Sequence, residues 1–307
     1  MHSRIAGTGR YLPARVLTND DLAQSVATSD EWIRTRTGIG ARHVADESEA
    51  TSDLALHASR EALAAAALDP ADVDLIVVAT TTPDMIFPST ACILQAKLGA
   101  KGGPAFDVQA VCSGFVYALT LADRMVATGA ARNALVVGAE VYSRILDWND
   151  RGTCVLFGDG AGAVVLVPSL EPGILAARLH ADGAHAPSLC VPGQVRDGAI
   201  AGSPFVQMDG QAVFKLAVRT VPGLIREAVA KAGWSLDQVD LVVPHQANLR
   251  IIEAMVNQLD VPMEKFVVNI QEYGNTSAAS VPLALYEAVD AGRIHDNDRI
   301  VLAAFGG

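Results

Sequence analysis

Three residues that could do chemistry each follow an apolar stretch of the kind that forms a buried strand. Cys112 follows residues 105–108, His245 follows residues 241–243, and Asn275 follows residues 266–269. Small residues around Cys112 lead into an apolar segment with helical spacing. Peptide N–H groups at a helix N-terminus favour negative charge. The position of Cys112 therefore predicts a stabilised thiolate and a nucleophile.

His245 and Asn275 suit a complementary task. A neutral imidazole and a carboxamide both donate hydrogen bonds, and two neutral donors directed at one oxygen stabilise an enolate or an oxyanion. Each residue also has a structural interpretation: a cysteine packs as a small hydrophobe, a histidine at a strand end is often a satisfied structural residue, and Asn275-Thr-Ser suits a helix N-cap. Their shared position at strand ends favours chemistry for the set.

The elements that must position these residues alternate between apolar runs and helical patterns, which predicts an α/β fold. Strands are expected over 75–79, 105–108, 134–138, 163–167, 241–243, 266–269 and 300–304. Helices are expected over 54–67, 88–98, 113–128, 213–232, 248–258 and 278–291.

The chain also contains an internal duplication. Residues 60–77 and 226–243 share nine identities in 18 positions at a constant offset of 166. Each stretch has the pattern of a helix, a short polar turn and a buried strand. Ligand sites in open α/β sheets form outside the carboxyl ends of strands. Two related halves would therefore bring two sets of strand-end residues into one cleft.

Composition excludes several classes of function. The 307 residues carry a net charge of −11, which argues against general nucleic-acid binding. No apolar run reaches the length of about 18 residues that a membrane span needs, and the N-terminus lacks the apolar region of a secretory signal. The four cysteines form no C-x-x-C pair, so no metal site is expected. The chain is expected to be cytoplasmic with reduced thiols. Gly158–Gly162 precedes a strand instead of opening a helix, so no nicotinamide cofactor is expected.

Several motifs together resemble one known family. The segments 112–115, 245–250 and 274–280 are similar to the three active-site motifs of β-ketoacyl-acyl carrier protein synthase III, and 28–39, 151–153 and 157–163 also fit. The resemblance covers essentially the whole chain. It implies a thiolase-like α/β fold, in which two duplicated halves, 1–170 and 171–307, form five αβαβα layers. It also implies a decarboxylating Claisen condensation of a short acyl-CoA primer, with acetyl-CoA expected, and malonyl-acyl carrier protein. The product would be 3-oxoacyl-acyl carrier protein, which starts fatty-acid biosynthesis, and no cofactor would be needed.

The resemblance also implies roles for individual residues. Cys112 would carry the acyl group, and His245 and Asn275 would stabilise the enolate formed by decarboxylation. The backbone N–H groups of Cys112 and Gly307 would form the oxyanion hole. The remaining assignments are Thr28, Trp32, Arg36, Arg151, Phe214 and Asn248 for CoA, Phe87 for the acyl pocket, and Arg250 and Lys215 for the carrier protein. Phe87 would reach the pocket across a homodimer, and core packing is the alternative for it.

Two features depart from the family pattern. Val111 stands before the nucleophile, where the family usually has alanine, and it would either narrow the acyl channel or have no effect. The family pattern continues past Gly306-Gly307 with a further glycine and a closing strand. The resemblance therefore leaves the Gly307 oxyanion donor and the edge of the second sheet open.

Three other functions share part of this pattern of residues. Papain-like cysteine hydrolases share the order Cys, His, Asn, but their Cys-Gly-Ser-Cys-Trp motif is missing here. A non-catalytic acyl-CoA-binding paralogue predicts a lost nucleophile, whereas Cys112 is present. A condensing enzyme or acyltransferase of secondary metabolism, such as an alkylquinolone or polyketide starter synthase, would share all three residues and stays open.

Overall fold

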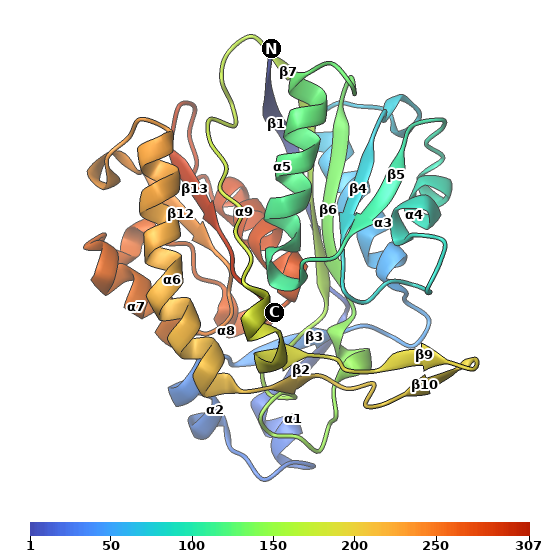
Figure 1. The fold of residues 1–307 in the computed structure, drawn as a ribbon, viewed down its shortest axis with the longest axis vertical. Coiled ribbons are helices and arrows are strands. Elements are labelled where there is room, and N and C mark those ends of the chain that lie inside the picture. Colours follow the sequence, from blue (N-terminus) through green and yellow to red (C-terminus); the bar gives the residue numbers. More distant parts are fainter.

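A computed structural model describes residues 1–307, and its first half is built on a five-stranded sheet of order β1-β7-β6-β4-β5 (Figure 1). The strands are β1 (His2–Tyr11), β4 (Ile76–Ala79), β5 (Ala105–Val108), β6 (Ala134–Glu140) and β7 (Gly160–Ser169). β5, β4 and β6 are parallel, and β7 runs antiparallel between β6 and β1. The expected strands of this half are therefore confirmed, and β5 lies at a sheet edge.

The second half repeats part of this arrangement. β12 (Leu241–Pro244) and β13 (Ile300–Ala303) pair in parallel, as β4 and β6 do. On the other side of β12, Phe266 forms a parallel bridge to Val242, where β5 pairs with β4 in the first half. The 166-residue offset that relates β4 to β12 also relates β6 to β13. The duplication found in the sequence is therefore a duplication of strand order.

The strand expected over 266–269 is wrong beyond this single bridge. The backbone N–H of Val267 still bonds to the carbonyl of Val242, at 2.9 Å. Beyond Val267, the side chain of Gln246 takes the place of backbone hydrogen bonds to a neighbouring strand. It donates to the carbonyl of Val267 at 2.9 Å and accepts from the N–H of Asn269 at 3.1 Å. A side chain that satisfies backbone groups in this way ends the pairing.

The long helices form three layers that alternate with the two sheets (Figure 1). Their bounds are α3 (Thr51–Ala65), α4 (Thr90–Leu98), α5 (Gly114–Ala127), α6 (Gly210–Lys231), α7 (Leu249–Leu259) and α9 (Ser280–Asp290). α3 and α4 cover the outer face of the first sheet, α5 and α9 lie between the sheets, and α6 and α7 cover β12 and β13.

Alternating side chains on the strands explain this layering. On β4, Val77 faces the central α5/α9 layer, whereas Ile76 and Val78 face α3 and α4. On β12, Val243 faces the central layer and Val242 faces α6 and α7. Successive residues of a strand point to opposite faces, and a sheet covered on both faces is apolar throughout. No helix of the fold combines the length and apolar character that crossing a bilayer requires.

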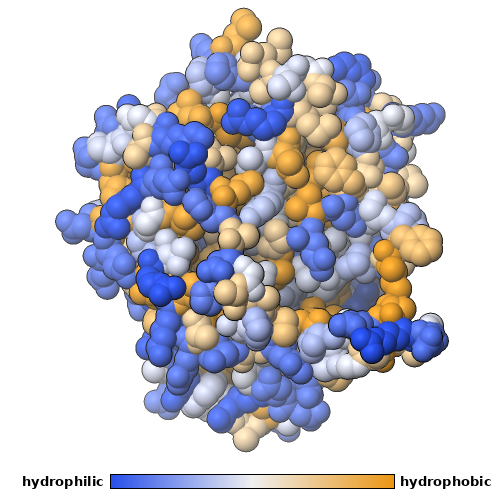
Figure 2. All heavy atoms as spheres, viewed as in Figure 1, coloured by the Kyte–Doolittle hydropathy of each residue, from blue (hydrophilic) through white to orange (hydrophobic).

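Shorter elements cluster at the lower end of the view in Figure 1. They are β2 (Arg15–Thr18), α1 (Asn19–Ala23), α2 (Asp30–Thr37), β3 (Ala41–Val44), α8 (Ile270–Tyr273), β8 (Leu189–Cys190), β9 (Gln194–Arg196), β10 (Ala199–Ala201) and β11 (Gln207–Met208). The β9–β10 hairpin projects as an arm with exposed apolar side chains, Val195 and Ile200. Figure 2 shows that apolar groups also reach the surface beside this arm.

Candidate active site

Two equivalent turns bring the halves together. A single 3₁₀ turn precedes each central helix: Val111–Ser113 before α5, and Ser277–Ala279 before α9. The first residue of each turn is left-handed, with φ of 46° at Val111 and 48° at Ser277. These two residues are separated by the same 166-residue offset. Positive φ is a genuine outlier for a β-branched residue such as Val111, so tertiary contacts must hold the turn that presents Cys112.

Cys112 lies where the two turns meet. Its side chain is only 3% exposed, and its Sγ lies 3.6 Å from the Oγ of Ser277. Burial, the largest cause, raises the pKa of the Cys112 thiol to about 12, and the negative charge of Glu140 adds to the rise. The stabilised thiolate expected from the start of a helix is therefore wrong for the resting protein. Burial favours the neutral thiol at rest, so a group that accepts its proton would assist the attack.

His245 follows β12 directly, as expected. The backbone N–H of His245 donates to the carbonyl of Ala303 at 2.7 Å, and its ring packs edge-on against Phe305, with centroids 5.5 Å apart. Burial lowers the pKa of His245 to about 3, and its Nδ1 has no hydrogen-bond partner. The imidazole is therefore neutral at physiological pH and carries one N–H that can donate.

Asn275 is held by both its backbone and its side chain. Its backbone N–H donates to the carbonyl of Leu156 at 2.8 Å, and its carbonyl accepts from the N–H of Gly158 at 3.0 Å. Its Oδ1 accepts from the N–H of Ser277 at 2.9 Å. Because the amide oxygen is engaged within the turn, the Nδ2 group is the end left to donate to a ligand.

The last residues of the chain connect His245 to Cys112. Phe305 packs on the ring of His245, and Gly306 lies so close to Cys112 that a Cβ on Gly306 would stand 2.8 Å from the Cys112 backbone N. A Cβ on Gly307 would instead meet the carbonyl oxygen of Leu189 at 2.7 Å. Gly306 is therefore the glycine in contact with the nucleophile, and the oxyanion role of Gly307 stays a prediction.

A second cluster gathers around Trp32, near the start of α2. The guanidinium groups of Arg36 and Arg151 lie over its indole ring, 4.5 Å and 4.6 Å from the centroid. Arg151 also donates to the carbonyl of Ala27 at 2.7 Å, beside Thr28, whose Oγ1 is buried without a partner. The structure thus brings together four of the residues expected to bind CoA.

The other expected residues adjoin this cluster on α6 and α7. The side chain of Asn248 caps α7 and donates to the carbonyl of Arg36 at 3.0 Å. Arg250 lies over the ring of Phe214, 5.5 Å from its centroid, and Lys215 is exposed on α6. Neither basic residue forms a salt bridge, nor do Arg36 and Arg151. In an acidic chain, unpaired cations of this kind remain free to meet phosphate or carboxylate groups.

Comparison with known proteins decides the family. Residues 106–183 match the family model of 3-oxoacyl-[acyl-carrier-protein] synthase III, and residues 229–307 match the model of its C-terminal part. The chain is 50% identical to 3-oxoacyl-[acyl-carrier-protein] synthase III from Aquifex aeolicus VF5, with a TM-score of 0.95, over 99% of this chain and 96% of that one. It belongs to the 3-oxoacyl-[acyl-carrier-protein] synthase III family.

Two further structures show the range of this similarity. The 3-oxoacyl-(acyl carrier protein) synthase III from Pseudomonas aeruginosa PAO1 is 43% identical, with a TM-score of 0.94, over 100% of this chain and 95% of that one. A priming β-ketosynthase from the R1128 polyketide biosynthetic pathway is 38% identical, with a TM-score of 0.93, over 100% of this chain and 93% of that one. The predicted family, the thiolase-like fold and the acyltransferase class are confirmed.

Phe87 stands apart from the residues of this synthase III site. Its side chain is 82% exposed, next to exposed Ile86 and Met85. The alternative that Phe87 belongs to the core of its own chain is therefore wrong. An acyl-pocket role for Phe87 requires a second subunit.

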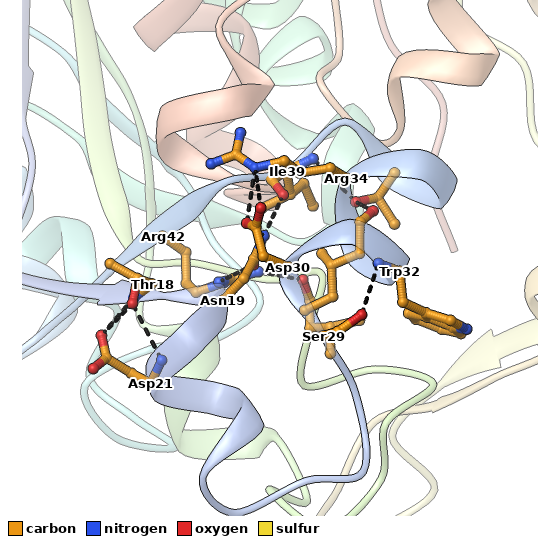
Figure 3. A network of polar contacts seen from close by, with 12 residues as sticks. Thr18, Asn19, Asp21, Ser29, Asp30, Trp32, Arg34, Ile39 and Arg42 are labelled. Atoms are coloured by element: carbon orange, nitrogen blue, oxygen red, sulfur yellow. Dashed lines mark hydrogen bonds and ion pairs between the residues drawn. The ribbon is translucent and has the colours of Figure 1, made fainter.

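A polar network that supports α2 was not predicted from the sequence (Figure 3). The side chain of Asn19 accepts from the fully buried Arg42 at 2.9 Å, and it donates to Asp30 and to the carbonyl of Ile39, both at 2.8 Å. Asp30 also pairs with Arg34 at 2.8 Å. These bonds tie α1, β3 and α2 together close to Trp32, which lies on α2. No local motif marks such a network, because its partners meet only in the fold.

Ser277 and Glu140 were also not predicted from the sequence. Ser277 lies inside the motif that contains Asn275, and Glu140 ends β6 with its side chain fully buried. A carboxylate at the end of an apolar strand was the available signal for Glu140.

Proposed function

We propose that Cys112 carries the acyl group in the condensation of a short acyl-CoA primer with malonyl-acyl carrier protein, the reaction that begins fatty-acid biosynthesis. One observation carries this proposal: the turns before the two central helices meet at the Cys112 sulfur, with Ser277 of the second half at 3.6 Å. Acetyl-CoA is the primer we favour. Neither half could form such a site without the other.

In the first step the Cys112 sulfur attacks the thioester carbonyl of the primer, and CoA leaves as a thiol. The backbone N–H of Cys112 would stabilise the oxyanion, and we keep Gly307 as the proposed second donor. Trp32, Arg36 and Arg151 would hold the adenine and phosphates of CoA, because an indole stacks on a base and the two guanidinium groups carry unpaired positive charge. Thr28, Phe214 and Asn248 would line the rest of its path.

In the second step malonyl-acyl carrier protein replaces CoA and loses CO₂. The neutral His245 imidazole and the Asn275 amide would donate to its thioester oxygen and stabilise the enolate. The enolate carbon then attacks the acyl-Cys112 carbonyl and releases the thiolate. A histidine with a pKa of about 3 suits this task, because it does not gain a proton from solution at working pH.

Mass spectrometry after incubation with acetyl-CoA tests the first step. We expect an acetyl increment on Cys112, and none in Cys112→Ser. His245→Ala and Asn275→Ala should still acquire the acetyl group but should not decarboxylate malonyl-acyl carrier protein. Cys154→Ser is a matched control, because Cys154 is a second fully buried, free cysteine. Decarboxylation by either alanine variant at the wild-type rate would contradict the assigned roles.

A starter synthase of secondary metabolism is a second candidate, and the 38% identical priming β-ketosynthase is the observation that favours it. Both functions use the same three residues, so the primer separates them. A panel of acyl-CoA primers of increasing length, with the fatty-acid carrier protein as the acceptor, measures this preference. Selective use of a long or branched primer would favour the second candidate.

We also propose that the enzyme works as a cytoplasmic homodimer with carrier-protein contacts at Arg250 and Lys215. The edge strand β5 is free to pair across a two-fold axis, and the exposed loop containing Phe87 adds apolar surface. The four free cysteines suit a reducing compartment. The two halves would divide near residue 170, directly after β7 ends at Ser169. Light scattering tests the dimer, and charge reversal at Arg250 tests the carrier contact.

A further inference from the structure

Glu140 is a buried carboxylate at the end of β6 that receives hydrogen bonds from several directions. The hydroxyl of Thr82 donates at 2.6 Å, that of Ser277 at 3.1 Å and that of Thr80 at 3.4 Å. The backbone N–H of Thr81 lies 3.1 Å and 3.2 Å from the two carboxylate oxygens. These donors come from the loop after β4 and from the turn before α9.

The directions of these bonds indicate an ionised Glu140. The Thr82 hydroxyl already accepts from the N–H of Val141 at 2.9 Å, and the Thr80 hydroxyl accepts from the N–H of Thr82 at 3.1 Å. Both hydroxyl protons are therefore directed at Glu140. A carboxylate only accepts, so it can satisfy all four donors at once, and protonation of Glu140 would require one of these hydroxyls to turn and accept from it.

Ser277 connects this carboxylate to the nucleophile. Its Oγ lies 3.1 Å from Oε1 of Glu140 and 3.6 Å from Sγ of Cys112. The duplication explains the arrangement, because the 166-residue offset relates Glu140 to Gly306 and Val111 to Ser277. Gly306 follows β13 and lies against the Cys112 turn, and Glu140 ends β6 against the Ser277 turn. Each half thus directs a strand end at the turn of the other.

We propose that the Glu140 carboxylate accepts the proton of Cys112 through the Ser277 hydroxyl during acylation, which rests on the proposed role of Cys112 as the acylated nucleophile. The S–H bond of Cys112 breaks as its sulfur bonds to the thioester carbonyl carbon. That proton passes to Oγ of Ser277, while the proton of Ser277 passes to Oε1 of Glu140. The bond between the carbonyl carbon and the CoA sulfur then breaks. CoA leaves as a thiol with the proton that the relay returns, and Glu140 is again a carboxylate.

Two other titratable groups interact with Glu140. One is Cys112 itself, and the other is Tyr142, whose ring stacks on Phe157 with centroids 4.4 Å apart. Burial raises the pKa of Tyr142 well above its ordinary value, so Tyr142 stays neutral. Burial also raises the pKa of Glu140, while the bonds from Thr82, Thr81 and Ser277 lower it. Acylation should therefore fall in acid as Glu140 gains a proton, and it should level off above that titration.

The rate of acetyl-Cys112 formation between pH 5 and 9.5, measured by rapid quench and mass spectrometry, tests the relay. The variants are Glu140→Gln, which keeps the size of the side chain, and Ser277→Gly, because glycine suits the left-handed backbone at Ser277. We expect both to acylate about 10²- to 10⁴-fold more slowly at pH 7, the usual contribution of general base catalysis. Their rates should then rise about tenfold per pH unit, because only direct loss of the thiol proton to solution remains.

Asp159→Asn is the matched control. Asp159 is fully buried and accepts from Ser143 and Ala45, and Cys112 is not among its hydrogen-bond partners. Its removal should lower thermal stability and leave the pH profile of acylation at the wild-type shape. If Glu140→Gln does not fold, Ser277→Gly decides the question alone.

The outcomes separate this inference from the proposed function. If wild-type Cys112 acquires no acetyl group, the proposed function fails. If it is acetylated and both variants keep the wild-type profile, the relay is overturned. A faster rate at pH 7 in Glu140→Gln would also overturn it, because removal of a negative charge beside a thiol has that effect by electrostatics alone.

Discussion

Replacement of His245 by glutamine is expected to make the fold less sensitive to acid. Burial lowers the pKa of His245 from the ordinary 6.5 to about 3 in the native state. Between these two pH values the unfolded chain binds a proton that the native protein does not. The contribution of His245 to stability is therefore complete above pH 6.5, and it is lost progressively as the pH falls toward 3.

The size of the effect follows from this shift. One pKa unit corresponds to about 1.4 kcal/mol, so the whole interval is worth roughly 5 kcal/mol. Between pH 7 and pH 5 the unfolded histidine passes from mostly neutral to almost fully protonated, and about 2 kcal/mol is lost. Glutamine has no proton to gain, so His245→Gln avoids this part of the loss.

Urea unfolding at pH 7 and pH 5 measures the difference. The free energy of unfolding of the wild type should fall by about 2 kcal/mol more than that of His245→Gln over this interval. Buried carboxylates such as Glu140 and Asp159 titrate in both proteins, so their contribution cancels in the comparison. His295→Gln is the control, because the side chain of His295 is 74% exposed, and it should lose as much stability as the wild type.

Equal losses in the wild type and in His245→Gln would refute the reasoning. They would mean that the imidazole takes up its proton in the native protein as easily as in the unfolded chain. Decarboxylation by the wild type would then titrate near pH 6.5, because His245 would stop being a neutral donor to the enolate below that pH. If the reasoning holds, decarboxylation by the wild type should show no titration of His245 between pH 5.5 and 8.

Three further results are expected. Trp32→Ala should raise KM for acetyl-CoA about 5- to 30-fold with little change in kcat in steady-state kinetics. The reason is that the stacking surface for the adenine is lost together with two cation–π contacts worth about 1–2 kcal/mol. An unchanged KM would show that CoA binds elsewhere. Gly306→Ala places a Cβ 2.8 Å from the Cys112 backbone N. Acetylation of Cys112 should therefore slow at least tenfold, and thermal unfolding should show that the free energy of unfolding falls by about 1–3 kcal/mol. Wild-type values for both would show that the backbone around Gly306 shifts to accommodate the Cβ. Phe87→Ala should shift the acyl-CoA panel toward longer primers and weaken the dimer in light scattering, because Phe87 is exposed in the single chain and would be buried in the pocket of a second subunit. An unchanged panel would remove Phe87 from the acyl pocket.

The sequence predicted the fold well where periodicity and duplication applied. Strands such as 105–108 and helices such as α5 follow from local apolar patterns, and the 166-residue offset predicted that β12 repeats β4. It failed at 266–269, because the side chain of Gln246 takes hydrogen bonds that a ladder would have used. A competing side chain that is close only in space leaves no periodic trace in the segment it affects.

The candidate site, like the fold, was predicted only in part. Cys112, His245 and Asn275 were predicted from residue types and strand-end positions, and the protonation of Cys112 was predicted wrongly. A helix N-terminus is a local feature that sequence reveals, whereas the burial that raises the thiol pKa depends on both halves closing over the sulfur.

The sequence by itself determined the class of fold, the family and the three residues proposed for the chemistry, because motifs and periodicity are properties of neighbouring residues. Only the tertiary structure decided that Ser277 and Glu140 face Cys112, that the thiol keeps its proton, that Gly306 contacts the nucleophile and that Phe87 is exposed. Each of these depends on side chains separated by long stretches of chain, and their meeting is set by how two sheets and a shared helical layer pack together.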